Sequence, residues 1–180
     1  MLIGGKAAPG YHVAKKVIKL INEASKVINK DNDVGDLLKV IFLPNYNVSN
    51  AEVIIPASDI SEHISTAGTE ASGTSNMKFV MNGGIVLGTL DGANIEILEE
   101  VGEENIYIFG ARVDQVGALR REMHSAKYEE YFPIELKEVF HEIQSGLFGN
   151  VREFSQLLAT ITSNNDYYLI GKDFKPFMEV

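Results

Sequence analysis

The chain has 180 residues, of which 45% are hydrophobic and 23% are charged, and its formal net charge is −9. This composition is typical of a globular protein with a substantial core. The negative charge, without a block rich in Lys or Arg, argues against a nucleic-acid-binding face. The absence of cysteine excludes disulfides, zinc–thiolate sites and thiol catalysis. With no membrane-spanning apolar run and no signal-peptide pattern, these features predict a cytoplasmic protein without nucleic-acid or membrane partners.

The first part of the chain predicts two strands and two helices. Residues 1–5 are typical of the end of a buried strand, and apolar residues at helical spacing predict a helix over residues 11–29. The nearly continuous apolar run at 37–43 predicts a strand covered on both faces. A short helix, capped by Ser49 and ended by Pro56, is expected to follow.

The middle of the chain continues the alternation of strands and helices. An extended segment is predicted at 61–64, followed by a loop rich in glycine and hydroxyl groups at 65–76. A helix that carries Lys78 is predicted over 73–84, and two buried strands at 85–89 and 106–109. The Asn-Gly-Gly at 82–84 suits a left-handed C-cap. A short helix between the two buried strands is expected to begin at Asp91 or Asn94.

Strands that alternate with helices predict an α/β fold with a parallel sheet and right-handed crossovers. We expect one domain over residues 1–180, with this alternation over 1–110 and mainly helices over 111–180, where the clearest apolar stripe is Val151, Phe154, Leu157, Leu158 and Ile161. In such folds ligands bind in loops at the carboxyl ends of strands. The polar residues of the loops at 44–48, 65–76 and 89–94 are therefore expected to converge.

The loop before Lys78 has the chemistry of an anion site next to an amine. A helix that begins near Gly73, Thr74 and Ser75 offers unpaired backbone N–H groups and two hydroxyls to a phosphate. Lys78 lies four residues after Thr74, on the same face of the helix. A cofactor with a phosphate and an aldehyde, such as pyridoxal phosphate, satisfies both features. Taken alone, the same residues also fit a helix cap and a lysine that extends to solvent.

Longer stretches of the sequence narrow this choice. The segment EASGTSNMKF at 70–79 closely resembles the pyridoxal-phosphate segment of α-glucan phosphorylases, the enzymes of glycogen, starch and maltodextrin. Further stretches resemble the same family in the same order: GGKAAPGYH, FLPNYNVS, GTLDGANIE and GEENIYIFG, which begin at residues 4, 42, 88 and 102. The resemblance is strong over the first 110 residues and loose beyond them.

The resemblance implies a role for several residues. Lys78 is expected to carry pyridoxal phosphate as a Schiff base, with the cofactor phosphate beside Gly73, Thr74 and Ser75 and with Tyr46 packed against the cofactor. Glycine is common in the family at the position of Ser75, and a backbone N–H contact survives that change. Asn47 replaces an arginine of some relatives, so no cofactor contact is assigned to it.

The family also implies a sugar site and leaves other polar residues outside it. Glu70, Ala71, Ser72 and Gly73 match residues that bind hydroxyls of the glucosyl unit, and a carboxylate accepts such hydrogen bonds well. Asp91 and Asn94 fit helix capping better than ligand binding. The four histidines show no metal-ligand spacing and are interpreted as structural or surface residues, so no metal site is predicted.

The implied activity is glucosyl transfer from α-1,4-glucan to phosphate, which gives glucose 1-phosphate. The implied architecture is part of a Rossmann-like, doubly wound C-terminal lobe of a two-lobed glycosyltransferase of the GT-B type, which forms a homodimer at full length. The basic segment with which the family binds substrate phosphate does not occur in this sequence, and apolar residues run almost to both ends. We therefore expect a fragment that is inactive alone and whose retention of the cofactor is open.

Two alternatives remain at this point. The chain could be a non-catalytic product, either a degenerate remnant or an interaction module, because an intact motif in a shortened chain fits that reading too. It could also be a lobe of a nucleotide-sugar glycosyltransferase with the same architecture, although Lys78 in its Asn-Met-Lys-Phe setting argues against this.

Overall fold

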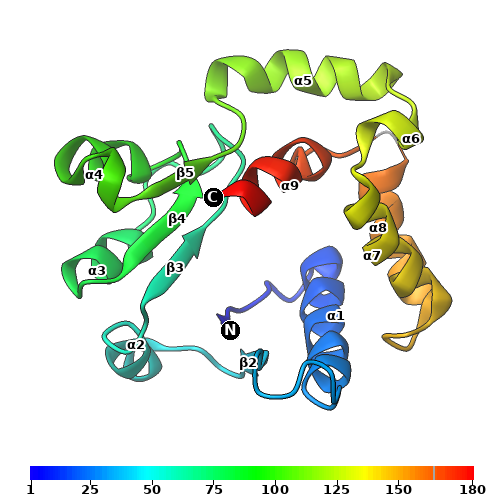
Figure 1. Ribbon diagram of the computed structural model, residues 1–180, viewed down its shortest axis with the longest axis horizontal. Helices are drawn as coiled ribbons and strands as arrows, with labels where there is room; N and C mark the ends of the chain where they lie inside the picture. The colour runs from blue at the N-terminus through cyan, green and yellow to red at the C-terminus, as the bar shows by residue number, and fades with distance from the viewer. Residues whose placement is uncertain (164) are drawn as a thin grey trace. The chain divides into compact units, whose positions relative to one another are not determined.

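The computed structural model describes residues 1–163 and 165–180, and this part of the chain forms two compact units (Figure 1). Unit 1 consists of Met1–Val48 and Lys137–Thr160, and unit 2 of Ser49–Leu136 and Ile161–Val180. Each unit combines a short parallel sheet with helices, so the predicted α/β class is confirmed. The single domain over 1–180 stays a prediction.

Unit 1 contains a two-stranded parallel sheet and a long helix. Strand β1 (Leu2–Gly4) pairs with β2 (Ile41–Leu43), with Ile3 opposite Phe42. The connection between them is α1 (His12–Ile28), which lies within the predicted helix. Most of helix α7 (Ile134–Ser145) and of helix α8 (Val151–Thr162) also belongs to this unit, which includes Lys137–Thr160.

The predicted strand over residues 37–43 is shorter and more exposed than expected. Only Ile41–Leu43 is extended, and the side chain of Leu37 is 90% exposed. One reason lies at Val40, whose N–H and C=O bond to the side chain of Asn29 at 2.8 Å each. These groups are therefore not available to a neighbouring strand. The expectation that the strands at 1–5 and 37–43 are buried is also wrong, since Leu2 is 52% exposed.

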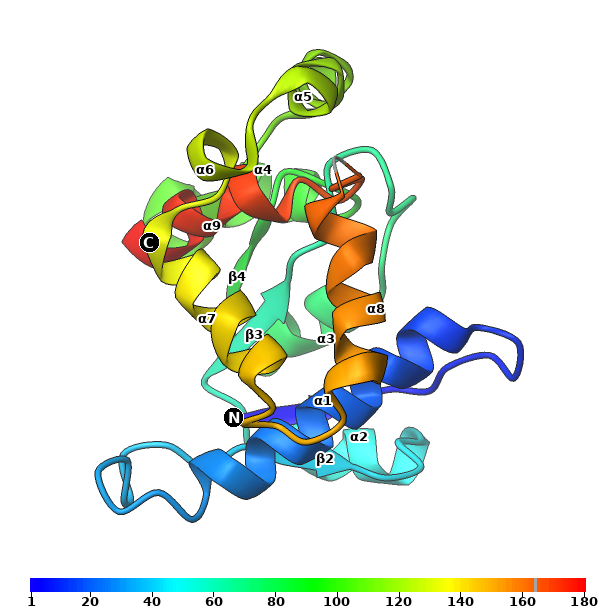
Figure 2. The same cartoon turned by 90° about the vertical axis from the view of Figure 1, so that its right-hand side faces the viewer.

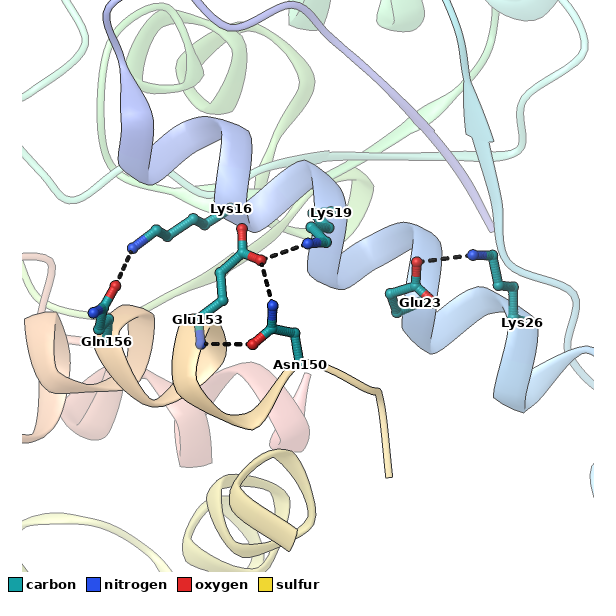
Figure 3. Close-up of polar contacts among 7 residues, drawn as sticks. All are labelled: Lys16, Lys19, Glu23, Lys26, Asn150, Glu153 and Gln156. Atoms are coloured by element: carbon teal, nitrogen blue, oxygen red, sulfur yellow. Dashed lines mark hydrogen bonds and ion pairs between the residues drawn. The ribbon is translucent and has the colours of Figure 1, made fainter. Parts of the chain in front are cut away.

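Helices α1 and α8 meet through polar side chains. Figure 2 shows α1 passing the N-terminal end of α8, and Figure 3 shows Lys19 paired there with Glu153. Lys16 Nζ donates to Gln156 one turn further along α8, at 2.8 Å. The side chain of Asn150 caps α8 by accepting from the N–H of Glu153. The predicted apolar stripe of α8 is buried at Phe154, Leu157 and Leu158.

Unit 2 is built on a parallel sheet of strand order β3-β4-β5. The strands are β3 (Ile60–His63), β4 (Ile85–Thr89) and β5 (Tyr107–Phe109), close to the predicted segments. His63 lies opposite Gly88, and Thr89 lies opposite Phe109. The carboxyl ends of β3 and β4 are therefore nearly level, and the loops that follow them begin side by side.

The sheet belongs to a unit with several helices. They are α2 (Val48–Ile54), α3 (Ser75–Met81), α4 (Asn94–Val101), the short 3₁₀ helix η1 (Glu103–Asn105), α5 (Val113–Ser125), α6 (Tyr128–Tyr131) and α9 (Ile170–Glu179). Helices α3 and α4 lie on one side of this sheet in Figure 1, and α9 lies beside β5 on the other. The expected cap Ser49 lies inside α2 instead of before it. The C-terminal glycine of α3 is as expected, because Gly83 has a φ of +83°. Among the described residues, no helix is long and apolar enough to cross a membrane.

Two apolar clusters hold unit 2 together. Val86 of β4 packs with Ile97 of α4 and Ile106, and Val80 of α3 joins them at the edge. This cluster fixes α3 and α4 against the sheet. A second cluster of Ala67, Ala111, Val116 and Leu169 lies beneath the loop that follows β3. Burial of Ala67 in the second cluster fixes the loop that follows β3, and Val80 in the first cluster fixes the end of α3.

Candidate functional site

A polar cavity of about 270 Å³ opens at the carboxyl ends of β3 and β4 in unit 2. Three segments form its wall: the end of β3, the loop that leads into α3, and the turn that precedes α4. The lining residues are His63, Ile64, Ser65, Glu70, Ser72, Gly73, Thr74, Ser75, Asn76, Asp91 and Asn94. Its size suits one sugar ring or phosphate group, because it is close to the lower limit of roughly 300 Å³ for small-molecule sites.

The structure brings most of the predicted ligand-binding residues of unit 2 together here. Glu70 and Ser72 line the cavity beside the three residues of the expected phosphate site, Gly73, Thr74 and Ser75. Gly73 has a φ of +79°, a conformation that glycine adopts readily. Ala71 lies in the same loop, but it is not among the described residues that line the cavity. The predicted convergence is confirmed for the loops at 65–76 and 89–94; that of the loop at 44–48, in unit 1, stays a prediction.

Lys78 lies one turn into α3, next to the cavity but not in its wall. Its backbone N–H donates to the carbonyl of Thr74 at 3.3 Å, and its side chain is exposed. The following residue, Phe79, turns inward and contacts the ring of His63, with 6.0 Å between ring centres. Helix α3 thus presents its first turn to the cavity and its lysine to the solvent at the rim.

Tyr46 belongs to unit 1 and is partly buried there. It follows β2, and its ring packs closely on Gly4 of β1. A Cβ atom at Gly4 would lie 3.0 Å from Tyr46 Cδ2, so a larger residue there would require the ring of Tyr46 to shift. The predicted contact of Tyr46 with a cofactor stays a prediction.

Asp91 is a buried carboxylate in the wall of the cavity. Its side chain accepts hydrogen bonds from Ser65 Oγ at 2.7 Å, from the N–H of Gly68 at 2.7 Å and from the N–H of Glu70 at 2.9 Å. Burial alone would raise the pKa of Asp91, but the hydrogen bonds from Ser65, Glu70, Gly68 and Gly92 outweigh it and lower the pKa. Asp91 is therefore ionised at neutral pH.

Asn94, the first residue of α4, follows Asp91 by three residues and is also buried. Its Oδ1 accepts from Asn76 Nδ2 at 2.8 Å, and its Nδ2 donates to the carbonyls of Thr89 and His63 at 3.0 and 3.3 Å. The side chain thus joins the ends of β3 and β4 to the start of α3. It can do so because Gly88 has no side chain: a Cβ there would lie 2.6 Å from Asn94 Nδ2.

These contacts correct the interpretation of Asp91 and Asn94 as helix caps. The residue at the N-cap of α4 is Ala93, which has no capping side chain. The carboxylate of Asp91 instead bonds to a loop more than 20 residues earlier in the chain. A signal for this was present, because the turn at 91–94 follows β4 directly and the ends of neighbouring parallel strands meet at one edge.

His63 also lines the cavity, and sequence reasoning had placed it among structural or surface residues. Its Nε2 lies 2.7 Å from Ser61 Oγ, within hydrogen-bond distance. Burial lowers the pKa of His63, so its ring is neutral at pH 7. Within the described residues no cluster of His, Asp and Glu side chains is suited to hold a metal ion.

The cavity can therefore bind a small ligand that carries several oxygens. Hydroxyls of Ser72, Thr74 and Ser75 offer donors, and the carboxylate of Glu70 is an acceptor for ligand hydroxyls. Both kinds of group lie on one loop, a few residues apart. This arrangement fits a sugar ring or a phosphate group.

Comparison with known proteins identifies the family. A family model described as carbohydrate phosphorylase matches residues 1–180. The chain is 53% identical over its whole length to glycogen phosphorylase 2 of Dictyostelium discoideum, and 51% identical over 98% of its length to glycogen phosphorylase of Saccharomyces cerevisiae. It is 48% identical over 99% of its length to the cytosolic α-glucan phosphorylase 2 of Arabidopsis thaliana. The chain spans about a fifth of the length of these relatives, namely 18%, 20% and 22%. It belongs to the carbohydrate phosphorylase family.

Proposed function

We propose that this chain forms the cofactor-binding part of an α-glucan phosphorylase, which transfers glucosyl units from α-1,4-glucan to phosphate and yields glucose 1-phosphate. One observation carries the proposal. In a chain of this family, the polar residues Glu70, Ser72, Gly73, Thr74 and Ser75 line a single cavity at the strand ends. The names of its relatives, glycogen and α-glucan phosphorylases, support the same reaction.

The residues present fit pyridoxal phosphate as the cofactor. The hydroxyls of Thr74 and Ser75 and the open backbone at Gly73 suit its phosphate group. Lys78, one turn further along α3, would hold its aldehyde carbon through the side-chain amine. The chemistry that the bound cofactor supplies in such an enzyme is proton exchange between its phosphate and the substrate phosphate. We further propose that Tyr46 packs against the cofactor.

The sugar-binding residues complete the assignment. Glu70 would accept hydrogen bonds from glucosyl hydroxyls through its carboxylate, and Ala71, Ser72 and Gly73 would contact the same unit. Orienting the sugar in this way lowers the entropy cost of bringing the reacting groups together. The segment 70–75 would then hold the glucosyl unit beside the phosphate group of the cofactor.

The proposal extends to architecture and assembly. Three parallel strands with helices on the sheet support a Rossmann-like, doubly wound lobe of a GT-B enzyme. A relative named as cytosolic supports a cytosolic location, although other relatives are named as chloroplastic. For the whole enzyme we propose a homodimer, with glucan and phosphate as its substrates.

The anchor is tested by labelling the purified chain with pyridoxal phosphate, reducing with borohydride and locating the adduct by peptide mass spectrometry. We expect Lys78 to carry at least tenfold more label than any other lysine at low cofactor concentration. Lys78→Arg keeps the positive charge and should abolish this label. Thr74→Val should reduce it several-fold without moving it, because the phosphate loses a donor. Label spread evenly over the exposed lysines would contradict the proposal.

A further inference from the structure

One loop forms most of the wall that would face a sugar. We name residues 65–73 the rim loop, and four of them, Ser65, Glu70, Ser72 and Gly73, line the cavity. The described part of this loop lies outside every helix and strand, so its shape depends on contacts with other segments. Four hydrogen bonds join the loop to the same short turn, residues 91–94.

The first part of the rim loop is held by the carboxylate of Asp91. Three donors spaced along six residues point at it: the hydroxyl of Ser65, the N–H of Gly68 and the N–H of Glu70. A carboxylate that accepts several N–H bonds is a strong acceptor, and removing it leaves those donors unpaired. Asp91 is only 5% exposed, so water cannot easily replace it.

The second part of the rim loop is held by the backbone of the turn. The N–H of Ala93 donates to the carbonyl of Ser72 at 2.6 Å. Gly92 allows this approach, because a Cβ there would lie 2.3 Å from Ser72 O and 3.2 Å from Glu70 Cγ. The start of α3, beyond the rim loop, depends on a different contact, between Asn76 and Asn94. The sugar side and the phosphate side of the cavity thus have separate attachments.

We infer that Asp91 is a positioning residue for sugar binding, a role that rests on the proposed function of the cavity. It fixes the backbone of Glu70 through the N–H of that residue, and so sets where the Glu70 carboxylate points. Its own charge is satisfied by four donors and is not needed for contact with the ligand. The phosphate side, attached through Asn94, should function without it.

The test compares three variants of the purified chain. Asp91→Asn keeps the size of the side chain but has one acceptor oxygen and an NH₂ group. In either orientation of the amide, this NH₂ faces a backbone N–H of Gly68 or Glu70. Ser65→Ala removes only one of the donors and should have a smaller effect. Asp59→Asn makes the same charge change at an exposed position of unit 2 and serves as the control.

The first measurement is ¹⁵N relaxation of the backbone, which reports the folded state directly. In the wild type the amides of Gly68 and Glu70 should have order parameters of about 0.85, and in Asp91→Asn they should fall below about 0.6. Amides of β4, such as those of Val86 and Gly88, should keep their values in every variant. Unchanged order at Gly68 and Glu70 would overturn the inference, and so would a loss of order throughout unit 2.

The second measurement separates this inference from the proposed function. Titration with glucose, followed by amide shifts of residues 70–73, should give at least tenfold weaker binding for Asp91→Asn, at most threefold weaker binding for Ser65→Ala, and no change for Asp59→Asn. Labelling of Lys78 by pyridoxal phosphate should remain within twofold of the wild type in all three. A wild-type chain without glucose-induced shifts would overturn the sugar-binding role, while the relaxation data would still decide whether Asp91 fixes the loop. Equal loss of glucose binding and of Lys78 labelling would make Asp91 a merely structural residue and overturn the inference.

Discussion

Asp91, in the turn before α4, and Asp173, in α9, are both shielded from water, but their pKa values shift in opposite directions. Asp91 is surrounded by four donors, which lower its pKa although burial opposes them. Burial raises the pKa of Asp173; the one N–H that it accepts, from Ala111, counteracts this, and the nearby charge of Asp166 adds to the rise. Hydrogen bonds thus outweigh burial at Asp91, whereas burial and a neighbouring negative charge prevail at Asp173.

This difference determines what each residue contributes to stability as the pH changes. Because the pKa of Asp91 is lowered on folding, its contribution is fully present above the ordinary value of 3.8 and is lost as the pH falls through the folded pKa. Asp173 has a raised pKa, so folding becomes less favourable as the pH rises from 3.8 to its folded pKa. The first residue is suited to organising a loop at neutral pH, and the second carries a cost there.

The largest effect is expected at Asn94, three residues after Asp91. Asn94→Ala should lower the free energy of unfolding by about 2–4 kcal/mol, because it removes the partner of Asn76 Nδ2 and the bonds to the carbonyls of Thr89 and His63 in a buried place, and creates a small void. Urea unfolding measures the change. Asn105→Ala, which removes an exposed side-chain bond to Val101, is the control and should cost far less. A loss below 0.5 kcal/mol for Asn94→Ala would show that water replaces these bonds.

A moderate effect of opposite sign is expected at Asp173. Asp173→Asn keeps an acceptor for the N–H of Ala111 and removes a charge that burial disfavours, so stability at pH 7 should rise by roughly 0.5–1 kcal/mol. The gain should disappear below pH 3.8, where the aspartate is protonated in both folded and unfolded states. Urea unfolding at pH 7 and pH 3.5 checks both statements. A variant that is less stable than the wild type at pH 7 would mean that the charge of Asp173 is needed.

The smallest effect is expected between α1 and α8 in unit 1. The pair formed by Lys19 and Glu153 is partly exposed, with side chains 45% and 25% accessible. Lys19→Ala should change the free energy of unfolding by less than about 0.5 kcal/mol, and 0.5 M NaCl should remove most of the difference. A loss of unfolding free energy above 1 kcal/mol would contradict this prediction and show that the pair contributes as much as a buried interaction.

Local patterns predicted most of the secondary structure. Helix α3 with its terminal glycine and strand β4 followed from apolar spacing and turn residues within about ten positions of one another. The strand at 37–43 was predicted too long because its first residues depend on Asn29, whose side chain takes up the backbone of Val40. No short-range pattern contains that contact.

The same difference between local patterns and contacts of distant residues applies to the candidate site. The segment 70–75 was recognisable because its residues are neighbours in the chain, and the structure places five of them at one cavity. Asp91 and Asn94 were interpreted as caps because a polar residue before a helix usually is one. Apart from Thr89 and Gly92, their partners lie 18 to 31 residues earlier, a distance that the pairing of β3 with β4 spans.

The absence of a side chain at position 88 has a consequence for sequence variation within the family. Asn94 reaches the carbonyl of His63 across the backbone of Gly88, where a methyl group would stand 2.6 Å from its amide nitrogen and 2.7 Å from that carbonyl. An alanine at 88 therefore requires both a shorter residue at 94 and a shift of β3. Positions 88 and 94 are expected to vary together among relatives, and a chain with asparagine at 94 should keep glycine at 88.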